Sequence, residues 1–171
     1  MQKSEYLPHT ALVYANTLQR NRLIESYVVG PKKTWASLTV MSAQPDADTS
    51  YFMGRVKAKR KRRSLPFPTM VDVGDLLERE ANPARAVTSI LYRARPSKRA
   101  EPPPLIIGDW THAAYDRFEV ILAVERREKG TTNNVCCYRG EGFWSLPPEQ
   151  IAEVCELHDR VIFGPVVFEM H

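Results

Sequence analysis

The nine residues from Arg55 to Arg63 carry seven positive charges. Like charges held this close repel one another, so something must offset the cost of keeping them together. Read as a β-strand, alternate residues from Arg55 to Arg63 point to one face, while Val56 and Ala58 point to the other. The run therefore predicts a strand with one cationic face, which ends at residues 64–68 because the two prolines there cannot continue a central strand.

The charge of the whole chain is distributed unevenly around this run. The net charge is only +4, but residues 55–99 hold 13 basic and 4 acidic side chains, a net +9. Residues 1–54 hold 5 basic and 4 acidic side chains, whereas residues 100–171 hold 6 basic and 12 acidic ones, a net −6. Such asymmetry indicates a polyanionic partner for the basic block.

Four interpretations of the basic run remain open. In a strand, side chains on one face are about 6.6–6.8 Å apart, close to the spacing of phosphates along a nucleic-acid strand. The run could instead be an edge strand or loop kept soluble by its charge, a nuclear localisation signal within 59–63, or a surface for an acidic protein. We favour contact with nucleic acid.

The residues predicted to contact nucleic acid fall into two clusters, the basic run and a group that follows a predicted helix. They are Arg55, Lys57, Lys59, Arg60, Lys61, Arg62 and Arg63 in the first cluster, and Arg93, Arg95, Lys98 and Arg99 in the second. Aromatic residues near them could stack on the bases of a single strand. These are Tyr51, Phe52, Phe67 and Tyr92.

Hydrophobic periodicity and capping signals predict the elements of the first half. Asn82 and Pro83 are suited to the N-cap and the first position of a helix. The predicted elements are a helix over 10–26 that could instead open with a short strand at 12–14, a strand hairpin over 34–60, and helices over 73–80 and 83–95.

The second half is predicted to contain a strand at 104–107, a short helix over 111–117, a strand over 118–125, a hairpin loop over 129–134, a strand over 135–139, a helix from Pro147 to 159, and a last strand over 161–168. Together the pattern predicts an α+β fold, a mainly antiparallel sheet with helices packed on one face. We expect a single domain over 1–171. The four prolines of 95–104 mark a possible internal linker between the basic N-terminal part and the acidic C-terminal part.

Two groups of residues could carry chemistry. Asp109, His112, Asp116 and Glu119 would share an arc of about 80° on a helix, and this donor set suits a divalent cation or acid–base catalysis. It would fit a metal-dependent nuclease, but residues from 118 onward are predicted to leave the helix.

The other group is Cys136, Cys137, Cys155 and His158. Cys155 and His158 have the spacing of two zinc ligands on a helix, and a thiolate from the preceding strand could complete the site. Adjacent cysteines seldom bind one ion, however, and a buried free thiol also packs as a small apolar group. A cysteine nucleophile, Cys136 or Cys137 with His112 or His158, lacks a flanking signature. Phosphate-binding loops are absent from the sequence too. From these patterns together we expect no metal, no other cofactor and no catalysis.

The longest apolar runs, 105–107 and 120–124, are far shorter than the roughly 20 residues of a membrane span, and the first ten residues contain no apolar signal segment. An odd number of cysteines, two of them adjacent, does not indicate a disulfide framework. We expect an intracellular protein without membrane contact, cytoplasmic or nuclear if the basic run is a localisation signal. The predicted function is a small nucleic-acid-binding protein, for RNA or a nucleoprotein complex rather than a specific DNA operator. The alternatives are a non-catalytic protein-interaction module and a metal-dependent nuclease.

Overall fold

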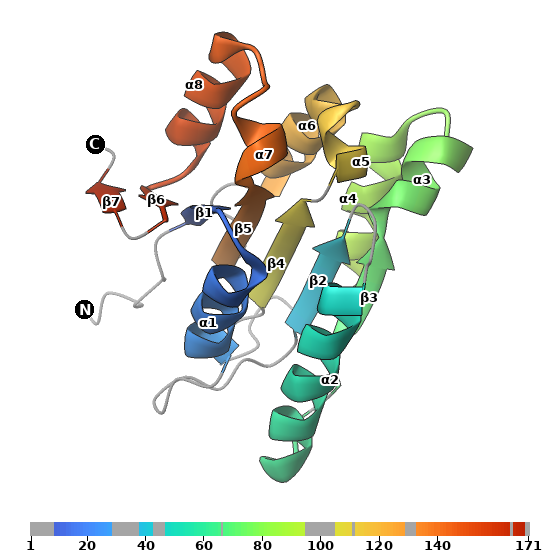
Figure 1. Cartoon of the computed structure of the whole chain (residues 1–171). Coiled ribbons are helices and arrows are strands. Elements are labelled where there is room, and N and C mark those ends of the chain that lie inside the picture. Colours follow the sequence, from blue (N-terminus) through green and yellow to red (C-terminus); the bar gives the residue numbers. More distant parts are fainter. Residues whose placement is uncertain are drawn as a thin grey trace, which may run out of the picture.

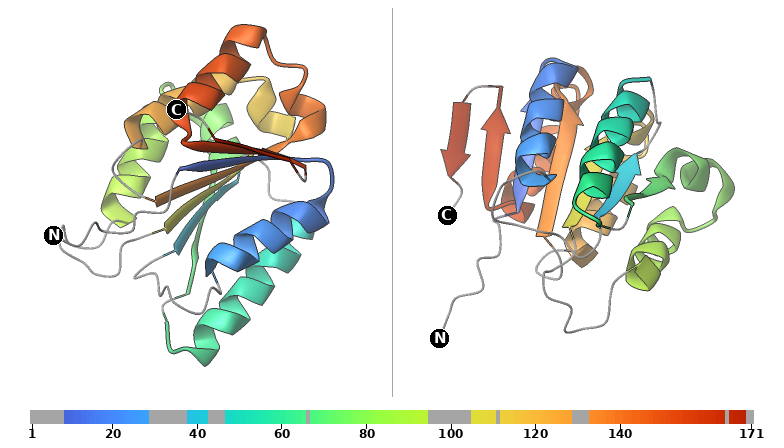
Figure 2. Two further views of the ribbon diagram at one scale, coloured as in Figure 1. Left: turned by 90° about the vertical axis from the view of Figure 1, so that its left-hand side faces the viewer. Right: turned by 90° about the horizontal axis from the view of Figure 1, so that it is seen from below.

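The computed structural model describes residues 9–28, 38–42, 47–65, 67–94, 105–110, 112–128, 133–164 and 166–169. These residues form an α/β fold in which one sheet lies between two layers of helices (Figures 1 and 2). Helices α1 and α2 cover one face of the sheet, and helices α4, α6 and α8 cover the other (Figure 2). We call these the α1/α2 face and the α4/α6/α8 face.

The sheet has seven strands in the order β3-β2-β4-β5-β1-β6-β7. The first six strands of the chain are parallel, and β7 pairs antiparallel with β6 at the edge. The strands are β1 (Thr10–Tyr14), β2 (Leu38–Ser42), β3 (Thr69–Asp72), β4 (Leu105–Trp110), β5 (Asn133–Arg139), β6 (Arg160–Phe163) and β7 (Val166–Glu169).

Helices join the parallel strands, as the crossover between parallel neighbours requires. They are α1 (Thr17–Val28), α2 (Ala47–Arg62), α3 (Val73–Arg79), α4 (Pro83–Ala94), α5 (His112–Tyr115), α6 (Phe118–Glu128), α7 (Gly140–Phe143) and α8 (Pro148–Leu157). None of the helices in the described part of the chain is long and apolar enough to cross a membrane.

The predicted α+β fold with an antiparallel sheet and helices on one face is wrong. Strands β1, β2 and β4 are buried at every residue. Strands of a parallel sheet covered on both faces show this continuous burial, whereas the alternation assumed from the sequence belongs to a sheet with one solvated face. The apolar run 105–107 is therefore part of a central strand of a doubly covered sheet.

The basic run is helical, so the predicted hairpin over 34–60 is wrong. Residues Met53, Val56 and Arg60 recur at helical spacing, and the latter two are buried. Lysine and arginine are good helix formers, and positive charge is favourable near a helix C-terminus. The helix ends as Ser64 adopts φ 55° and the amide of Leu65 donates to the carbonyl of Arg60 at 2.9 Å, a Schellman-type cap.

The predicted strand over 118–125 is also wrong, because these residues belong to α6. Phe118, Ile121, Leu122 and Glu125 lie at helical spacing and are all buried. Strand β5 was predicted correctly as a strand, but it pairs in parallel with β4 and β1 rather than in a hairpin. The loop residues 129–132 lie outside the described part of the chain.

Several local predictions are confirmed. Helices α3, α4 and α8 form, and Asn82 caps α4 by accepting a hydrogen bond from the amide of Arg85 at 3.2 Å. The helix predicted over 10–26 is β1 followed by α1, the alternative given for its opening residues. The last strand divides at Gly164, with φ 56°, into β6 and β7. The possible linker 95–104 lies outside the described residues.

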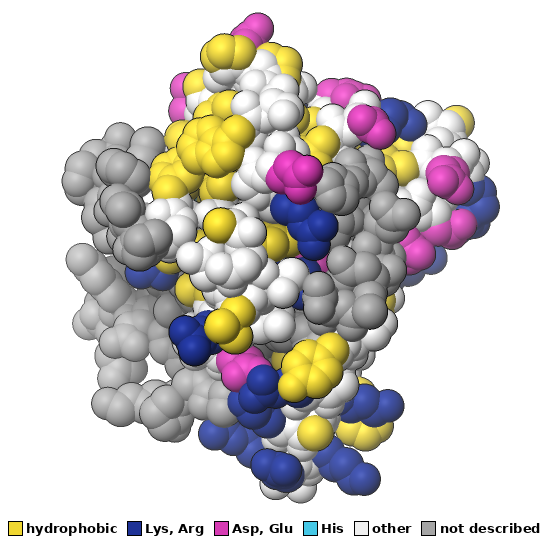
Figure 3. All heavy atoms as spheres, in the orientation of Figure 1, with side chains coloured by type: hydrophobic (Ala, Val, Ile, Leu, Met, Phe, Trp, Pro, Cys, Tyr) yellow, Lys and Arg dark blue, Asp and Glu magenta, His cyan; other side chains and the backbone are white. Residues whose placement is uncertain are grey.

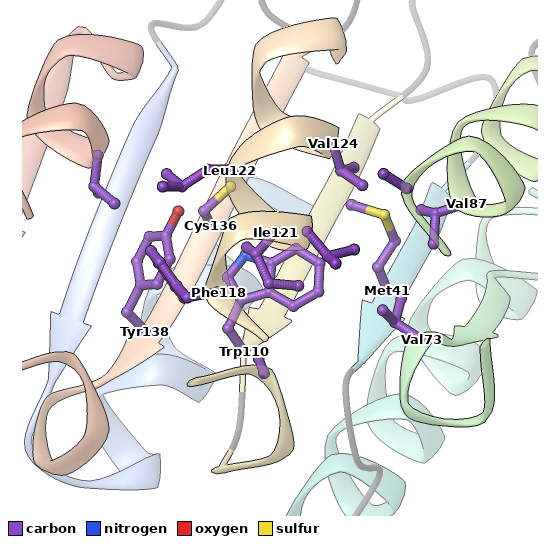
Figure 4. Close-up of a cluster of buried hydrophobic side chains, with 14 of the residues drawn as sticks. Met41, Val73, Val87, Trp110, Phe118, Ile121, Leu122, Val124, Cys136 and Tyr138 are labelled. Carbon is purple, nitrogen blue, oxygen red and sulfur yellow. The ribbon is translucent and has the colours of Figure 1, made fainter. Parts of the chain in front are cut away.

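Each face of the sheet has its own apolar core. The larger core, on the α4/α6/α8 face, includes Met41, Trp110, Phe118 and Tyr138 (Figure 4). The smaller core, on the α1/α2 face, holds side chains that alternate with these along the same strands, among them Leu12, Val40, Ile107 and Cys137. Neighbouring residues of one strand thus contribute to different cores.

Candidate functional site

The carboxyl ends of the parallel strands define one edge of the sheet. There β1 continues into α1 on the α1/α2 face, whereas its neighbour β5 continues through α7 into α8 on the α4/α6/α8 face (Figures 1 and 2). Open parallel sheets bind ligands in the crevice that forms where adjacent strands diverge in this way. The pair β2/β4 meets this condition through α2 and α6, and the pair β1/β5 meets it at the end of β1.

A pocket of about 420 Å³ lies at this point. It is within the usual size range of small-molecule sites. Its walls come from the ends of β1 and β6 and from α7, which follows β5. The lining residues are Val13, Tyr14, Ala15, Gly140, Glu141, Trp144, Phe163 and Gly164.

The pocket has an aromatic wall. Trp144 stacks on Phe163 with ring centroids 5.2 Å apart and an angle of 26° between the planes, and it meets Phe143 edge-on. The Trp144 side chain is nevertheless 59% exposed. Gly140 allows a close approach of α7 to β1, since a Cβ there would lie 3.2 Å from the carbonyl oxygen of Tyr14. The carboxylate of Glu141 supplies negative charge at the rim.

A buried polar cluster lies at the same edge, on the α1/α2 face. Arg20 Nη1 donates to both oxygens of Asp109, at 3.3 and 3.5 Å, and its guanidinium lies 5.7 Å from the ring centroid of Tyr14. Ser42 at the end of β2 is in register with Asp109 on β4. Among the described residues, Arg20 Nη2 and Ser42 Oγ are buried and have no hydrogen-bond partner.

The electrostatics of this cluster keep Arg20 charged. Burial alone would lower the pKa of Arg20, but the nearby Asp109 carboxylate and the neighbours Tyr14 and Cys137 raise it above the usual value. Burial, and then Asp109, raise the pKa of both Tyr14 and Cys137. The thiol and the phenol therefore stay protonated at neutral pH, and Cys137 is unsuited to act as a nucleophile.

The predicted set Asp109, His112, Asp116 and Glu119 is not brought together as one helix face. Asp109 is buried in β4 and paired with Arg20, whereas Asp116 and Glu119 are exposed on the other side of the sheet. Glu119 accepts a hydrogen bond from Arg117 at 3.3 Å. The helical spacing fails because a strand end and a turn interrupt the segment.

The predicted cysteine–histidine set is brought together only in part. Cys136 and His158 lie close to each other, with Glu125 as a third neighbour. Cys137 points to the opposite face of the sheet, and Cys155 is not part of this group. Sequence reasoning missed Glu125 because it assigned the segment to a strand.

The predicted basic residues of α2 have three different surroundings. Arg60 is buried, and the Arg55 and Lys59 side chains pair with Glu25 of α1 at 3.1 and 3.4 Å. The remaining four are exposed and form what we call the α2 basic surface (Figure 3): Lys57, Lys61, Arg62 and Arg63. Lys57 Nζ lies 4.7 Å from the ring centroid of Phe67, which is 53% exposed.

The second predicted cluster does not extend this surface over the α1/α2 face. Arg93 is exposed on α4, which covers the opposite face. Arg95, Lys98 and Arg99 lie outside the described residues. Tyr51 and Tyr92 are exposed, at 62% and 66%, so both rings are accessible.

The residues of the carboxyl-edge pocket were not predicted from the sequence. Their only signal is the aromatic pair Phe143-Trp144 after Gly140 and Gly142, which matches no nucleotide-binding loop. Comparisons with protein-family models, with curated proteins and with solved structures gave no match.

Proposed function

We propose that this chain is a ligand-binding domain that takes a small, flat, largely apolar molecule into the pocket beside Trp144. The observation that carries the proposal is the place of this pocket, at the carboxyl ends of β1 and β6 beside α7, where the connections after β1 and β5 go to opposite faces of the sheet. A tryptophan that is more than half exposed on a pocket wall supports it, since such a ring loses water contact when a flat ligand stacks on it.

The lining predicts which ligands are favoured. Trp144 and Phe163 offer ring faces, and the Glu141 carboxylate attracts a positive group or a hydrogen-bond donor. The buried Arg20–Asp109 pair acts as a support, because it ties the first turn of α1 to the end of β4 beside Tyr14. The expected ligand is therefore a planar ring system that carries a donor or an amine at one end.

Three probes with the same ring and different charge test this proposal: indole, tryptamine and indole-3-acetate. Titrations followed by NMR or calorimetry are expected to rank tryptamine first. Trp144→Ala should weaken all three by at least roughly fivefold, because a ring pair is worth about 1 kcal/mol beyond the area it buries. Glu141→Gln should remove the preference for tryptamine and leave indole unchanged.

Tyr92→Ala provides the matched control, since it removes an equally exposed ring from α4, far from the pocket lining. It should leave the affinity of all three probes unchanged. The proposal would be contradicted if no probe bound at about 10 mM. Such a result would mean that the binding free energy is smaller than about 3 kcal/mol. Equal effects of Trp144→Ala and Tyr92→Ala would contradict it too.

The α2 basic surface favours a second function, binding of nucleic acid. One of its four exposed cations, Lys57, lies beside the accessible ring of Phe67, and the accessible ring of Tyr51 lies beside Arg55 on the same helix. Cations combined with accessible rings suit a single strand. If four phosphates are neutralised, affinity for single-stranded RNA should fall roughly 50-fold between about 50 and about 200 mM salt. Affinity should not depend on base sequence, because the proposal includes no contact to base edges.

The test measures binding of labelled single-stranded RNA, single-stranded DNA and duplex DNA at both salt concentrations. Replacing Lys57, Lys61 and Arg62 by Glu should abolish binding. The matched control replaces three exposed arginines elsewhere, Arg79, Arg85 and Arg127, by Glu, with the same change in net charge. If both triple variants weaken binding equally, the net charge of the chain alone accounts for the affinity, and the α2 basic surface has no special role. Absence of binding at low salt would leave an acidic protein as the partner for this surface.

A further inference from the structure

Three side chains from separate elements meet inside the larger core. Glu125 comes from α6, Cys136 from β5, and His158 follows the last turn of α8. One ligand atom of each lies within 4.8 Å of those of the other two. All three are buried, with exposed fractions of 3%, 0% and 3%. A carboxylate, a thiol and an imidazole in such a core are the ligand types of zinc.

We propose that Glu125, Cys136 and His158 bind a zinc ion that fastens α6 and α8 to the centre of the sheet. The donor set is the first support. Sulfur and imidazole nitrogen favour zinc over magnesium or calcium, which take oxygen ligands almost alone. Three protein ligands leave a fourth tetrahedral position for a water molecule or for the Tyr138 hydroxyl, which lies beside Cys136 on the same side of β5 (Figure 4).

The distance between the sulfur and the carboxylate oxygen is close to that of a tetrahedral site. Cys136 Sγ and Glu125 Oε1 are 3.0 Å apart. With usual zinc–sulfur and zinc–oxygen bonds, tetrahedral geometry places these two atoms about 3.5 Å apart. The side chains therefore need to separate by only about half an ångström to admit the ion, which a rotation of the Glu125 carboxylate can provide.

The histidine is already oriented in the way metal ligands usually are. His158 Nδ1 lies 2.7 Å from the carbonyl oxygen of Val154, one turn earlier. When Nδ1 donates to this carbonyl, the lone pair of the ring is on Nε2, which is then the atom that would bind an ion. Histidine ligands of zinc commonly donate their other ring nitrogen to a backbone carbonyl in this manner, which fixes the tautomer and the plane of the ring.

Charge balance also favours the ion. Zinc binding displaces the Cys136 proton, and that of Glu125 where it is protonated, into solvent. The resulting thiolate and carboxylate carry two negative charges, which the divalent ion neutralises, while His158 stays neutral. The site is then uncharged as a whole, so its burial avoids the cost of an isolated ion in the core.

The first test measures zinc in the untagged chain, expressed with zinc in the medium and purified without chelator. We expect inductively coupled plasma mass spectrometry to give one zinc ion per chain. Cys136→Ala should lose it, and Glu125→Gln should lower zinc affinity at least roughly tenfold. Cys137→Ala is the matched control, because it removes the adjacent buried thiol on the other face of the same strand. It should keep the full zinc content.

X-ray absorption of the wild-type chain keeps the proposal testable if Cys136→Ala does not fold. The expected zinc spectrum has one sulfur neighbour at about 2.3 Å and nitrogen or oxygen neighbours at about 2.0 Å. Two sulfurs, or none, would overturn the assignment. A wild-type chain that contains no zinc, even after refolding with zinc present, would overturn it as well, and so would zinc retained in folded Cys136→Ala. The three side chains would then form a metal-free hydrogen-bonded group.

Discussion

Replacing Asp109 by Asn should cost this protein a large part of its stability. The Asp109 side chain is 3% exposed and that of its partner Arg20 is 1% exposed, with 3.3 Å between them. Asn has nearly the same shape, so packing is preserved while the negative charge is removed. At this distance the pair interacts by about 5 kcal/mol at an effective dielectric constant near 20. A buried guanidinium left without its counter-charge costs about 3–5 kcal/mol.

Urea unfolding followed by circular dichroism measures this loss. Domains of this size have a free energy of unfolding of about 5–15 kcal/mol, so the variant loses roughly a third or more of it. With a slope of about 2 kcal/mol per molar urea, the midpoint should fall by about 2 M. Asp75→Asn is the matched control. Its ion pair with Arg79 is 58% and 61% exposed, so the loss should stay below about 1 kcal/mol.

A double variant separates the interaction from the general effect of burial. Arg20→Met with Asp109→Leu removes both charges together, and it should be more stable than Asp109→Asn alone. If Asp109→Asn and Asp75→Asn shift the midpoint equally, the buried pair does not have the role derived from its geometry. The stability of the double variant is compared with that of Arg20→Met and Asp109→Leu made singly. If the double variant loses the sum of these two losses, the two side chains are not coupled.

Four further predictions concern backbone conformation, a side-chain clash and a buried carboxyl. Ser64→Gly should add about 1 kcal/mol to the free energy of unfolding, because Ser64 has φ 55° at the end of α2; a lower urea midpoint would contradict this. Gly54→Ala should stabilise the helix by about 0.5–1 kcal/mol, since a Cβ there meets open space. Gly142→Ala should destabilise by about 1–3 kcal/mol, as its Cβ would clash with the ring of Tyr115, and the two alanine variants should shift thermal unfolding in opposite directions. Burial raises the pKa of Glu125 from 4.5 to about 7, so the metal-free fold holds a proton that the unfolded chain has already released. Its stability should fall by about 3 kcal/mol as pH rises from 4.5 to 7, and Glu125→Gln should remove this part of the pH dependence.

Local signals in the sequence predicted several elements correctly, but not how they pair. Asn82 and Pro83 located the start of α4 because a cap and a helix N-terminus depend only on neighbouring residues. Pairing direction depends on which faces are covered, and that information is spread over the whole chain. The apolar segment at Val120–Val124 is compatible with either a strand or a helix, and only the spacing of its buried neighbours Phe118 and Glu125 distinguishes them.

The candidate sites depend on the same missing information. The pocket beside Trp144 exists because β1 and β5 are parallel neighbours, although more than a hundred residues separate them in the chain. The basic run was recognised from its charge. Because it was predicted to be a strand, however, all of its odd-numbered cations were expected on one face. In the helix, Arg55 and Lys59 lie one turn apart and pair with Glu25, so fewer cations face solvent than the alternating pattern implied.

Strand β5 shows that two residues adjacent in the sequence can have different chemical surroundings. Cys136 and Cys137 are adjacent, equally buried and alike in type, and the sequence did not show which of them would belong to a site. The pleat of the strand sends Cys136 toward Glu125 and His158 on one face, and Cys137 toward Asp109 on the other. Alanine at either position removes the same atoms from the same depth. Because the two variants share this packing cost, any difference in zinc content between them reports what each thiol faces rather than the loss of a buried side chain.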